Sequence, residues 1–109
     1  MIWLLAVLAV TAPKRTPQVV ERGRGTYAVW CTACHGPEGA GDGPTAHTLN
    51  PPPRNFRTQK FKQGARVEQI FQTLGKGVPG SAMQPFRNLS DDERWALAWY
   101  VLELKAGRR

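Results

Sequence analysis

The sequence Cys31-Thr32-Ala33-Cys34-His35 decides how the rest of the chain is interpreted. On a helical turn, Cys31 and Cys34 stand three positions apart and His35 stands four from Cys31, so the three side chains project toward one side. One flat ligand could then contact two thiols and an imidazole together. This spacing is typical of covalent haem attachment, in which the cysteines form thioethers and the histidine binds iron from the same face.

Three other interpretations of the cysteines compete with haem attachment. A disulfide suits an exported protein but gives His35 no role. A thioredoxin-like redox pair requires a βαβ unit, which the sequence lacks. A zinc site is suggested by the spacing from Cys31 and Cys34 to His47, but no histidine follows His47 at the expected distance and His35 is poorly placed to complete a tetrahedron. None of them explains the histidine as well as haem does.

The composition describes one small, positively charged domain. The 109 residues include 15 Lys and Arg and 8 Asp and Glu, which gives a formal net charge of +7. With 41% hydrophobic and 21% charged residues, the chain is neither a disordered acidic tail nor a multi-span membrane protein. A core of this size is marginal and commonly gains from a disulfide, a metal or a cofactor. The charge predicts an acidic partner surface, whether protein, lipid headgroup or polyphosphate.

Residues 1–12 form an uncharged apolar run that ends at Pro13. As a helix the run would span only about 16 Å, whereas a hydrocarbon core is about 30 Å thick. The small residues Val10 and Ala12 suit cleavage after Ala12, so we expect a signal peptide at 1–12. A short N-terminal anchor remnant is the alternative, because no Lys or Arg precedes the run. Either places residues 13–109 in a periplasmic or extracytoplasmic location, and the anchor would leave them membrane-associated.

The first predicted helix follows Thr16 and Pro17, a typical N-cap and N1 pair. Small, apolar and aromatic residues then recur at three- and four-residue steps: Val20, Gly23, Tyr27 and Cys31. A glycine inside a helix costs about 1 kcal/mol relative to alanine, but it lets a second helix approach closely. We therefore expect a close helix crossing at Gly23.

Two further helices are predicted downstream. The middle one has an i, i+3, i+4, i+7 set of apolar residues closed by glycines: Val67, Ile70, Phe71 and Leu74. The last begins at the capping box Ser90–Glu93 and runs to Lys105. It has two apolar stripes, Leu97, Tyr100, Val101 and Leu104 on one side and Trp95, Trp99 and Leu102 on another. The second stripe either packs against loops or cofactor or forms an exposed patch for a permanent partner.

The fold class predicted from these patterns is all-α with long loops. Half of residues 36–53 are Gly or Pro, so half of that segment cannot be regular structure. No period-two run of β-branched residues and no internal repeat appears in the sequence. We therefore expect the helices and the long Gly/Pro-rich loops to surround the Cys31–His35 motif together.

If His35 binds iron, Met83 is the predicted ligand on the opposite face. It is the only methionine after residue 12 and lies in a Gly/Pro-rich loop, residues 75–85. A lone methionine is ordinarily a core filler, and His47, the other strong donor, is more simply an exposed histidine. A thioether favours ferrous iron and raises the reduction potential. Six-coordinate iron has no vacant site for a small-molecule substrate, so electron transfer rather than enzymatic catalysis is expected.

From Gly23 to Leu104 the chain resembles class I monohaem cytochrome c of the bacterial branch. The matching residues are Gly23, Tyr27, Cys31, Cys34, His35, the loops Gly39-Ala-Gly41-Asp42-Gly43-Pro44 and Leu49-Asn-Pro51-Pro-Pro53, Met83, Leu97 and Tyr100. The resemblance implies a cytochrome c domain at 13–109, with about three main helices around one haem c. It implies that Cys31 and Cys34 tether the haem and that His35 and Met83 bind its iron.

The resemblance carries two further structural expectations and one departure. Gly23 and Tyr27 should cross the face of the last helix that bears Leu97 and Tyr100. A proline carbonyl in the first loop should accept a hydrogen bond from the histidine; Pro44 is expected, with Pro51, Pro52 and Pro53 as alternatives. The departure is Gln84, which stands between Met83 and Pro85, where this branch commonly has proline directly after the methionine.

A basic run with interleaved aromatics follows the first loop: Arg54, Phe56, Arg57, Lys60, Phe61, Lys62 and Arg66. It is either a solvated face with two core phenylalanines or a docking surface for acidic redox proteins, with one arginine near a haem propionate. A nucleic-acid surface is a third interpretation, which export argues against.

The predicted function is a one-electron carrier that shuttles electrons between extracytoplasmic redox partners and is a monomer when free. The alternatives are a haem c subunit of a larger dehydrogenase or oxidase complex, and a haem enzyme with a displaceable methionine ligand.

Overall fold

Four α-helices and one 3-10 turn make up the regular secondary structure of residues 11–108, the part of the chain that the computed structural model describes. In chain order they are α1 (Pro17–Trp30), α2 (Thr32–His35), η1 (Ala46–Thr48), α3 (Val67–Lys76) and α4 (Asp91–Lys105). No strand occurs in this range, so the predicted all-α class is confirmed. The signal peptide predicted at 1–12 lies outside the described residues except for Thr11 and Ala12.

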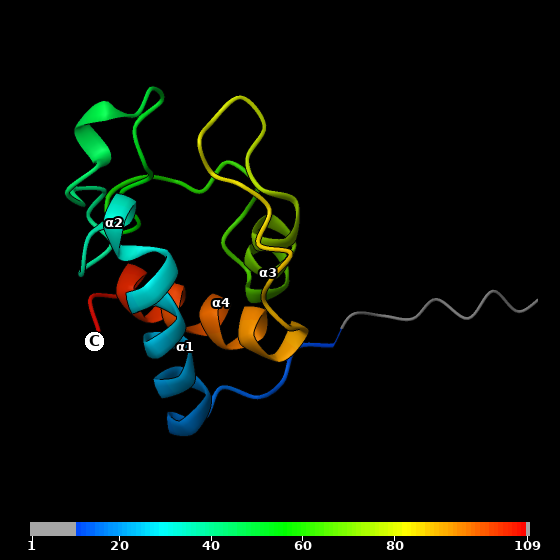
Figure 1. The fold of residues 1–109 in the computed structure, drawn as a ribbon. Coiled ribbons are helices and arrows are strands. Elements are labelled where there is room, and N and C mark those ends of the chain that lie inside the picture. The colour runs from blue at the N-terminus through cyan, green and yellow to red at the C-terminus, as the bar shows by residue number, and fades with distance from the viewer. Residues whose placement is uncertain (1–10, 109) are drawn as a thin grey trace, which may run out of the picture.

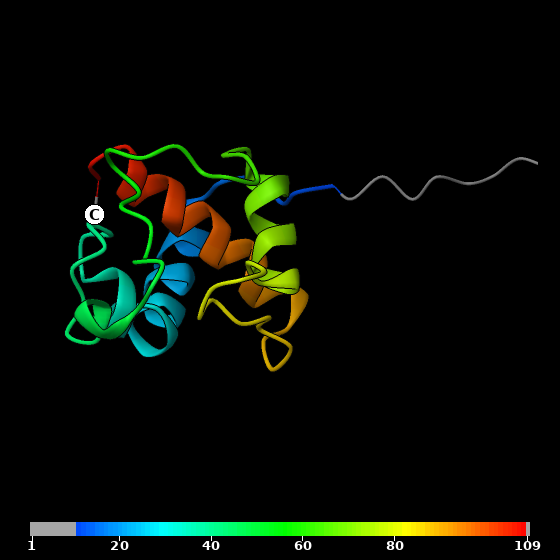
Figure 2. The same ribbon diagram turned by 90° about the horizontal axis from the view of Figure 1, so that it is seen from above.

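Helix α4 lies at the centre of the arrangement. It packs against α1 on one side and α3 on the other, as Figure 2 shows from above. In Figure 1 the loop that contains η1 and the loop that follows α3 extend to the same end of the molecule, beyond α2. Within residues 11–108, every helix is too short or too polar to cross a membrane.

The helix starts predicted from capping patterns are observed. The Thr16 hydroxyl accepts a hydrogen bond from the backbone N–H of Val19 at 3.1 Å. Ser90 and Glu93 cap each other: the Glu93 N–H donates to the Ser90 hydroxyl at 3.1 Å, and the Ser90 N–H donates to the Glu93 carboxylate at 3.0 Å. Each cap satisfies donors that the first turn of a helix leaves without partners.

The close crossing predicted at Gly23 joins α1 to α4. A methyl group added at Gly23 would overlap the carbonyl oxygen of Ala96 and would lie 2.8 Å from Cβ of Tyr100. The ring centroids of Tyr27 and Tyr100 lie 5.3 Å apart in the same interface. The predicted crossing is therefore confirmed, and its closest backbone contact is at Ala96, the residue before the fully buried Leu97.

The tryptophan stripe of α4 is packing surface. Trp95 is buried and stacks on Phe71 of α3, with ring centroids 3.8 Å apart and an interplanar angle of 9°. Trp99 is partly buried, and its Nε1 donates to the carbonyl oxygen of Pro13 at 2.9 Å. Leu102 packs at the edge of the same core. Of the two interpretations of this stripe, internal packing is the one observed.

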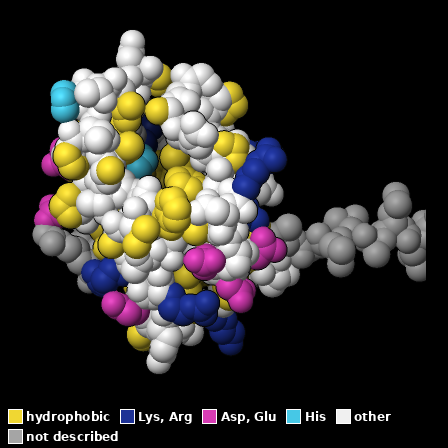
Figure 3. Space-filling view, in the orientation of Figure 1, with side chains coloured by type: hydrophobic (Ala, Val, Ile, Leu, Met, Phe, Trp, Pro, Cys, Tyr) yellow, Lys and Arg dark blue, Asp and Glu magenta, His cyan; other side chains and the backbone are white. Residues whose placement is uncertain are grey.

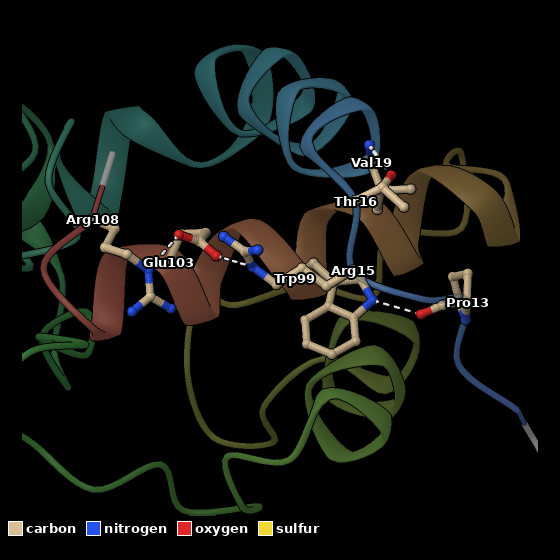
Figure 4. Close-up of polar contacts among 7 residues, drawn as sticks. All are labelled: Pro13, Arg15, Thr16, Val19, Trp99, Glu103 and Arg108. Atoms are coloured by element: carbon tan, nitrogen blue, oxygen red, sulfur yellow. Dashed lines mark hydrogen bonds and ion pairs between the residues drawn. The ribbon is translucent and has the colours of Figure 1, made fainter.

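Residues 13–15, before α1, are bound to α4 by an ion pair as well as by the hydrogen bond from Trp99 (Figure 4). Glu103 is only 3% exposed, and its carboxylate pairs with the side chains of Arg15 and Arg108, the latter at 2.8 Å. The hydrogen bond from Arg15 is the main cause that lowers the pKa of Glu103. Both ends of the described chain are thus held by one buried carboxylate.

Candidate cofactor site

A cavity of about 300 Å³ opens between the helices and the two long loops. All four predicted site residues line it: Cys31, Cys34, His35 and Met83. Most of its other lining side chains are apolar, among them Leu49, Phe56, Phe61, Ile70, Leu74, Phe86 and Val101. Figure 3 shows the hollow with hydrophobic side chains around it. His47, the competing donor, is exposed in η1 and does not line this cavity.

Helix α2 is the helical turn that the cysteine motif predicted. The N–H groups of Cys34 and His35 both donate to the carbonyl oxygen of Cys31, at 3.3 and 2.9 Å. Both cysteines are free thiols, so the disulfide interpretation is not supported. Within residues 11–108, no three side chains of His, Cys, Asp or Glu are grouped so that they could hold one metal ion, and the zinc interpretation gains no support either.

The imidazole of His35 is oriented by a backbone carbonyl. Its Nδ1 lies 3.0 Å from the carbonyl oxygen of Arg54. A carbonyl can only accept, so Nδ1 is the protonated nitrogen and Nε2 keeps its lone pair. That tautomer is the one a metal bound through Nε2 requires.

The expected proline acceptor is wrong, because the carbonyl belongs to Arg54 and not to Pro44 or to Pro51, Pro52 or Pro53. The residues beside Pro44 instead bond to backbone carbonyls of α2: Gly43 N–H donates to Cys34 O at 3.1 Å and Thr45 N–H donates to Ala33 O at 3.0 Å. The chain returns to the imidazole only after Pro53, so the carbonyl of Arg54 is the one within hydrogen-bonding distance of His35.

Burial favours the neutral forms of the titratable groups at this site. Loss of solvent lowers the pKa of the His35 imidazole, and the Arg54 carbonyl opposes that shift in part. Loss of solvent also raises the pKa of the Cys31 thiol to about 12, with a further contribution from Cys34. The cavity therefore offers a low-polarity environment in which a neutral imidazole is a good ligand.

Phe56 lies against the imidazole. The ring centroids of Phe56 and His35 are 4.5 Å apart, with an interplanar angle of 29°. One of the interpretations of the basic run made Phe56 a core residue, and Phe56 is indeed buried. Sequence analysis missed both the contact of Phe56 with His35 and the hydrogen bond to the Arg54 carbonyl, because neither contact has a sequence motif. The only signal for them was the proline run that turns the chain back toward α2.

The loop that carries Met83 is fixed by its own hydrogen bonds. The Val78 N–H donates to the Met83 carbonyl at 3.0 Å, and the Met83 N–H donates to the hydroxyl of Ser81 at 3.1 Å. That hydroxyl donates in turn to the Val78 carbonyl at 2.6 Å. Met83 lines the cavity with Gln84 in place, so the departure noted in the sequence does not remove it from the site.

The basic run is divided between the cavity and the surface. Arg54 and Lys62 line the cavity, and Arg57 lies 3.9 Å from the carboxylate of Glu38. Lys60 and Arg66 are exposed. The aromatic residues turn inward, since Phe61 packs edge-on against the buried Phe56 with ring centroids 5.4 Å apart.

Comparisons with known proteins bear on the family and the fold of this chain. The model of the family described as cytochrome c oxidase, cbb3-type, subunit III, matches residues 18–101. Among solved structures, a chain of the reducing HAO-like protein complex from Kuenenia stuttgartiensis is similar, with 33% sequence identity and a TM-score of 0.70. The match covers 88% of the present chain and 45% of that chain, so the present chain spans less than half of its length. A search of curated proteins found no match.

Proposed function

This chain belongs to the cytochrome c family of the cbb3-type oxidase subunit III model, and we propose on that premise that it carries single electrons between extracytoplasmic redox proteins. The family binds haem c covalently, and the fold is that of a class I-like monohaem cytochrome c. The proposal also names the residues that hold the haem, gives the protein a carrier role without catalysis of its own, and describes the partners of the protein.

The cavity residues fit haem c. Two free thiols and an imidazole lie on one helical turn, and a thioether lies on a separate loop of the same cavity. In this proposal Cys31 and Cys34 would tether the haem through thioethers, and His35 Nε2 and Met83 Sδ would bind its iron. The observation that carries this assignment is that Met83, about 50 residues further along the chain, lines the same largely apolar cavity as Cys31, Cys34 and His35.

Bound haem c supplies an iron that cycles between the ferrous and ferric states. The chain's residues keep that site dry and its ligands in place. Leu74, Ile70 and Val101 supply apolar surface to the cavity, and the hydrogen bonds around Met83 and His35 fix both ligand-bearing segments. Ligands that stay in place between oxidation states suit electron transfer, because little has to move when the charge changes.

Replacing Met83 by alanine tests the assignment. Oxidised protein with methionine on the iron has a weak far-red charge-transfer band, which Met83→Ala should abolish while haem stays covalently attached. The vacated position should then bind carbon monoxide or cyanide, which the native protein should bind slowly at neutral pH. Gln84→Ala, an exposed neighbour that also borders the cavity, should keep the band. A band that persists in Met83→Ala excludes Met83 as ligand, and rapid carbon monoxide binding to the native protein indicates a haem enzyme.

Acidic redox proteins are the proposed partners. Exposed lysines at 60 and 62 lie in the segment that borders the cavity, and Lys62 itself lines it. Together with a net charge of +7, they would attract an acidic surface to that side of the molecule. An extracytoplasmic location suits these partners and the maturation of haem c.

We expect the free protein to be a monomer whose electron exchange with an acidic partner slows as salt is raised, because the Debye length falls from about 30 Å at 0.01 M to about 3 Å at 1 M. Changing Lys60 and Lys62 together to glutamine should slow the reaction at low salt and have little effect at high salt. Lys14→Gln, an exposed site before α1, is the control.

The alternative is a haem c subunit of a larger complex, which the likeness to a longer chain of such a complex favours. A stable complex that co-purifies with the protein and resists salt would establish that alternative in place of the shuttle.

A further inference from the structure

Two groups of one short segment contact the imidazole of His35. The carbonyl of Arg54 accepts from Nδ1 at 3.0 Å, and the ring of Phe56 stacks on the imidazole with centroids 4.5 Å apart. The hydrogen bond fixes the tautomer and one point of the ring. That hydrogen bond and the link through Cβ already restrict rotation of the ring about the bond that Nε2 would form with a metal. The aromatic face of Phe56 limits that rotation from the side.

Phe56 is itself held by contacts from several parts of the chain. Its N–H donates to the carbonyl of Gly39 at 2.8 Å, and its carbonyl accepts from Nζ of Lys105 at 3.2 Å. The ammonium of Lys105 also lies 4.7 Å from the ring centroid of Phe61, which packs edge-on against Phe56. Lys105 is the last residue of α4, so the end of the central helix reaches the segment that contacts the imidazole.

Gly39 completes this support. It has a φ of +74°, and a methyl group there would lie 2.5 Å from Cδ2 of Phe56. The first loop therefore approaches the Phe56 ring as closely as a backbone without a side chain allows. With Gly39 against the ring and Lys105 on the carbonyl, Phe56 is constrained in both backbone and side chain.

We propose that Phe56, held by Lys105 and Gly39, is a positioning residue that sets the rotation of the His35 imidazole about its bond to the haem iron. The inference rests on the proposed function, in which His35 binds iron through Nε2. Groups that orient a metal-bound histidine tune the metal as well as the ligand. In ferric haem the plane of the axial imidazole influences how unpaired spin is shared among the four haem methyl groups. Proton NMR of the oxidised protein therefore responds to that rotation.

The test compares Phe56→Leu with Phe71→Leu. The two phenylalanines are 7% and 8% exposed, but Phe71 does not line the cavity and stacks on Trp95 instead. We expect both variants to lose stability. Only Phe56→Leu should change the order and spread of the four haem methyl resonances, with the methionine charge-transfer band still present. Lys105→Met, at a partly exposed position, should change the same resonances in a protein that stays folded.

Two results would overturn the inference: methyl resonances that stay at native positions in Phe56→Leu and Lys105→Met, or ones that move as far in Phe71→Leu. If Phe56→Leu does not fold, Lys105→Met alone decides. Failure of the proposed function would look different, because the native protein itself would then lack covalent haem or the methionine band.

Discussion

Replacing Gly23 by leucine is expected to abolish the folded protein. A Cβ at this position would overlap the Ala96 carbonyl and lie 2.8 Å from Cβ of Tyr100, and neither neighbour can move without displacing α4. Helix α4 contacts both α1 and α3, so its displacement would open the core and the cavity. Since the net stability of a domain is only about 5–15 kcal/mol, this rearrangement removes most of it.

The smaller change Gly23→Ala should leave a folded protein whose loss of stability can be measured. Alanine gains about 1 kcal/mol in helix propensity, but overpacking against backbone costs about 3 kcal/mol. We therefore expect a net loss of about 2 kcal/mol in the free energy of unfolding, measured by denaturant titration of the haem-bearing protein.

Gly25 on the same helix is the matched control for Gly23. It is exposed, and an added methyl group would meet nothing within 4 Å. Gly25→Ala should therefore stabilise the protein by about 0.5–1 kcal/mol through propensity alone. Equal effects of the two alanine substitutions would contradict the close crossing.

Features that depend on local sequence could be predicted. The caps at Thr16 and Ser90 bond within three residues of themselves, so their partners are fixed by the helix that they begin. The cysteine motif is equally local, because one helical turn sets the relative positions of its three side chains. Gly23 was informative for a related reason: a glycine on an otherwise apolar helical stripe has few explanations besides a close neighbour.

Contacts between segments that are distant in the sequence could not be predicted. The acceptor for His35 is the Arg54 carbonyl, and every residue has a carbonyl, so nothing in the sequence marks this one. The stacking of Phe56 on His35 depends on the path of the loop between them, which is rich in Gly and Pro and has no period to follow. Met83 was predicted as a ligand because it is the only methionine after residue 12 and lies in a Gly/Pro-rich loop.

The buried carboxylate of Glu103 escaped sequence analysis for the same reason. It lies among apolar positions of α4, and its partner Arg15 is 88 residues away along the chain. Together with the bond from Trp99 to Pro13, this pair makes the segment before α1 part of the folded domain. A chain shortened into this segment would therefore lose contacts of the core helix α4 and not merely a tail.

Replacing Glu103 by glutamine is expected to lower the free energy of unfolding at pH 7 by about 2 kcal/mol, the range for hydrogen bonds to a charged group. The side chains of Arg15 and Arg108 are 45% and 61% exposed, so water solvates them in the variant and the loss stays below that of a fully buried pair. Glu21→Gln is the matched control, because Glu21 pairs with Arg24 on the surface with 71% of its side chain exposed. That variant should change stability by less than about 0.5 kcal/mol.

The contribution of Glu103 should also depend on pH in a definite direction. Its pKa is lowered in the folded protein, first by the hydrogen bond from Arg15, so folding favours the ionised form. This contribution is complete above the unfolded pKa of about 4.3 and is lost as the pH falls through the lower, folded pKa. Denaturant titrations from pH 7 to pH 3 should therefore show the native protein and Glu103→Gln converging in stability as the acid protonates Glu103. Acid protonation of other groups, such as Glu93, affects both proteins alike, so the difference between the two curves isolates Glu103. A difference that stays constant over this range would show that the ion pairs, as drawn in Figure 4, do not stabilise the ionised carboxylate.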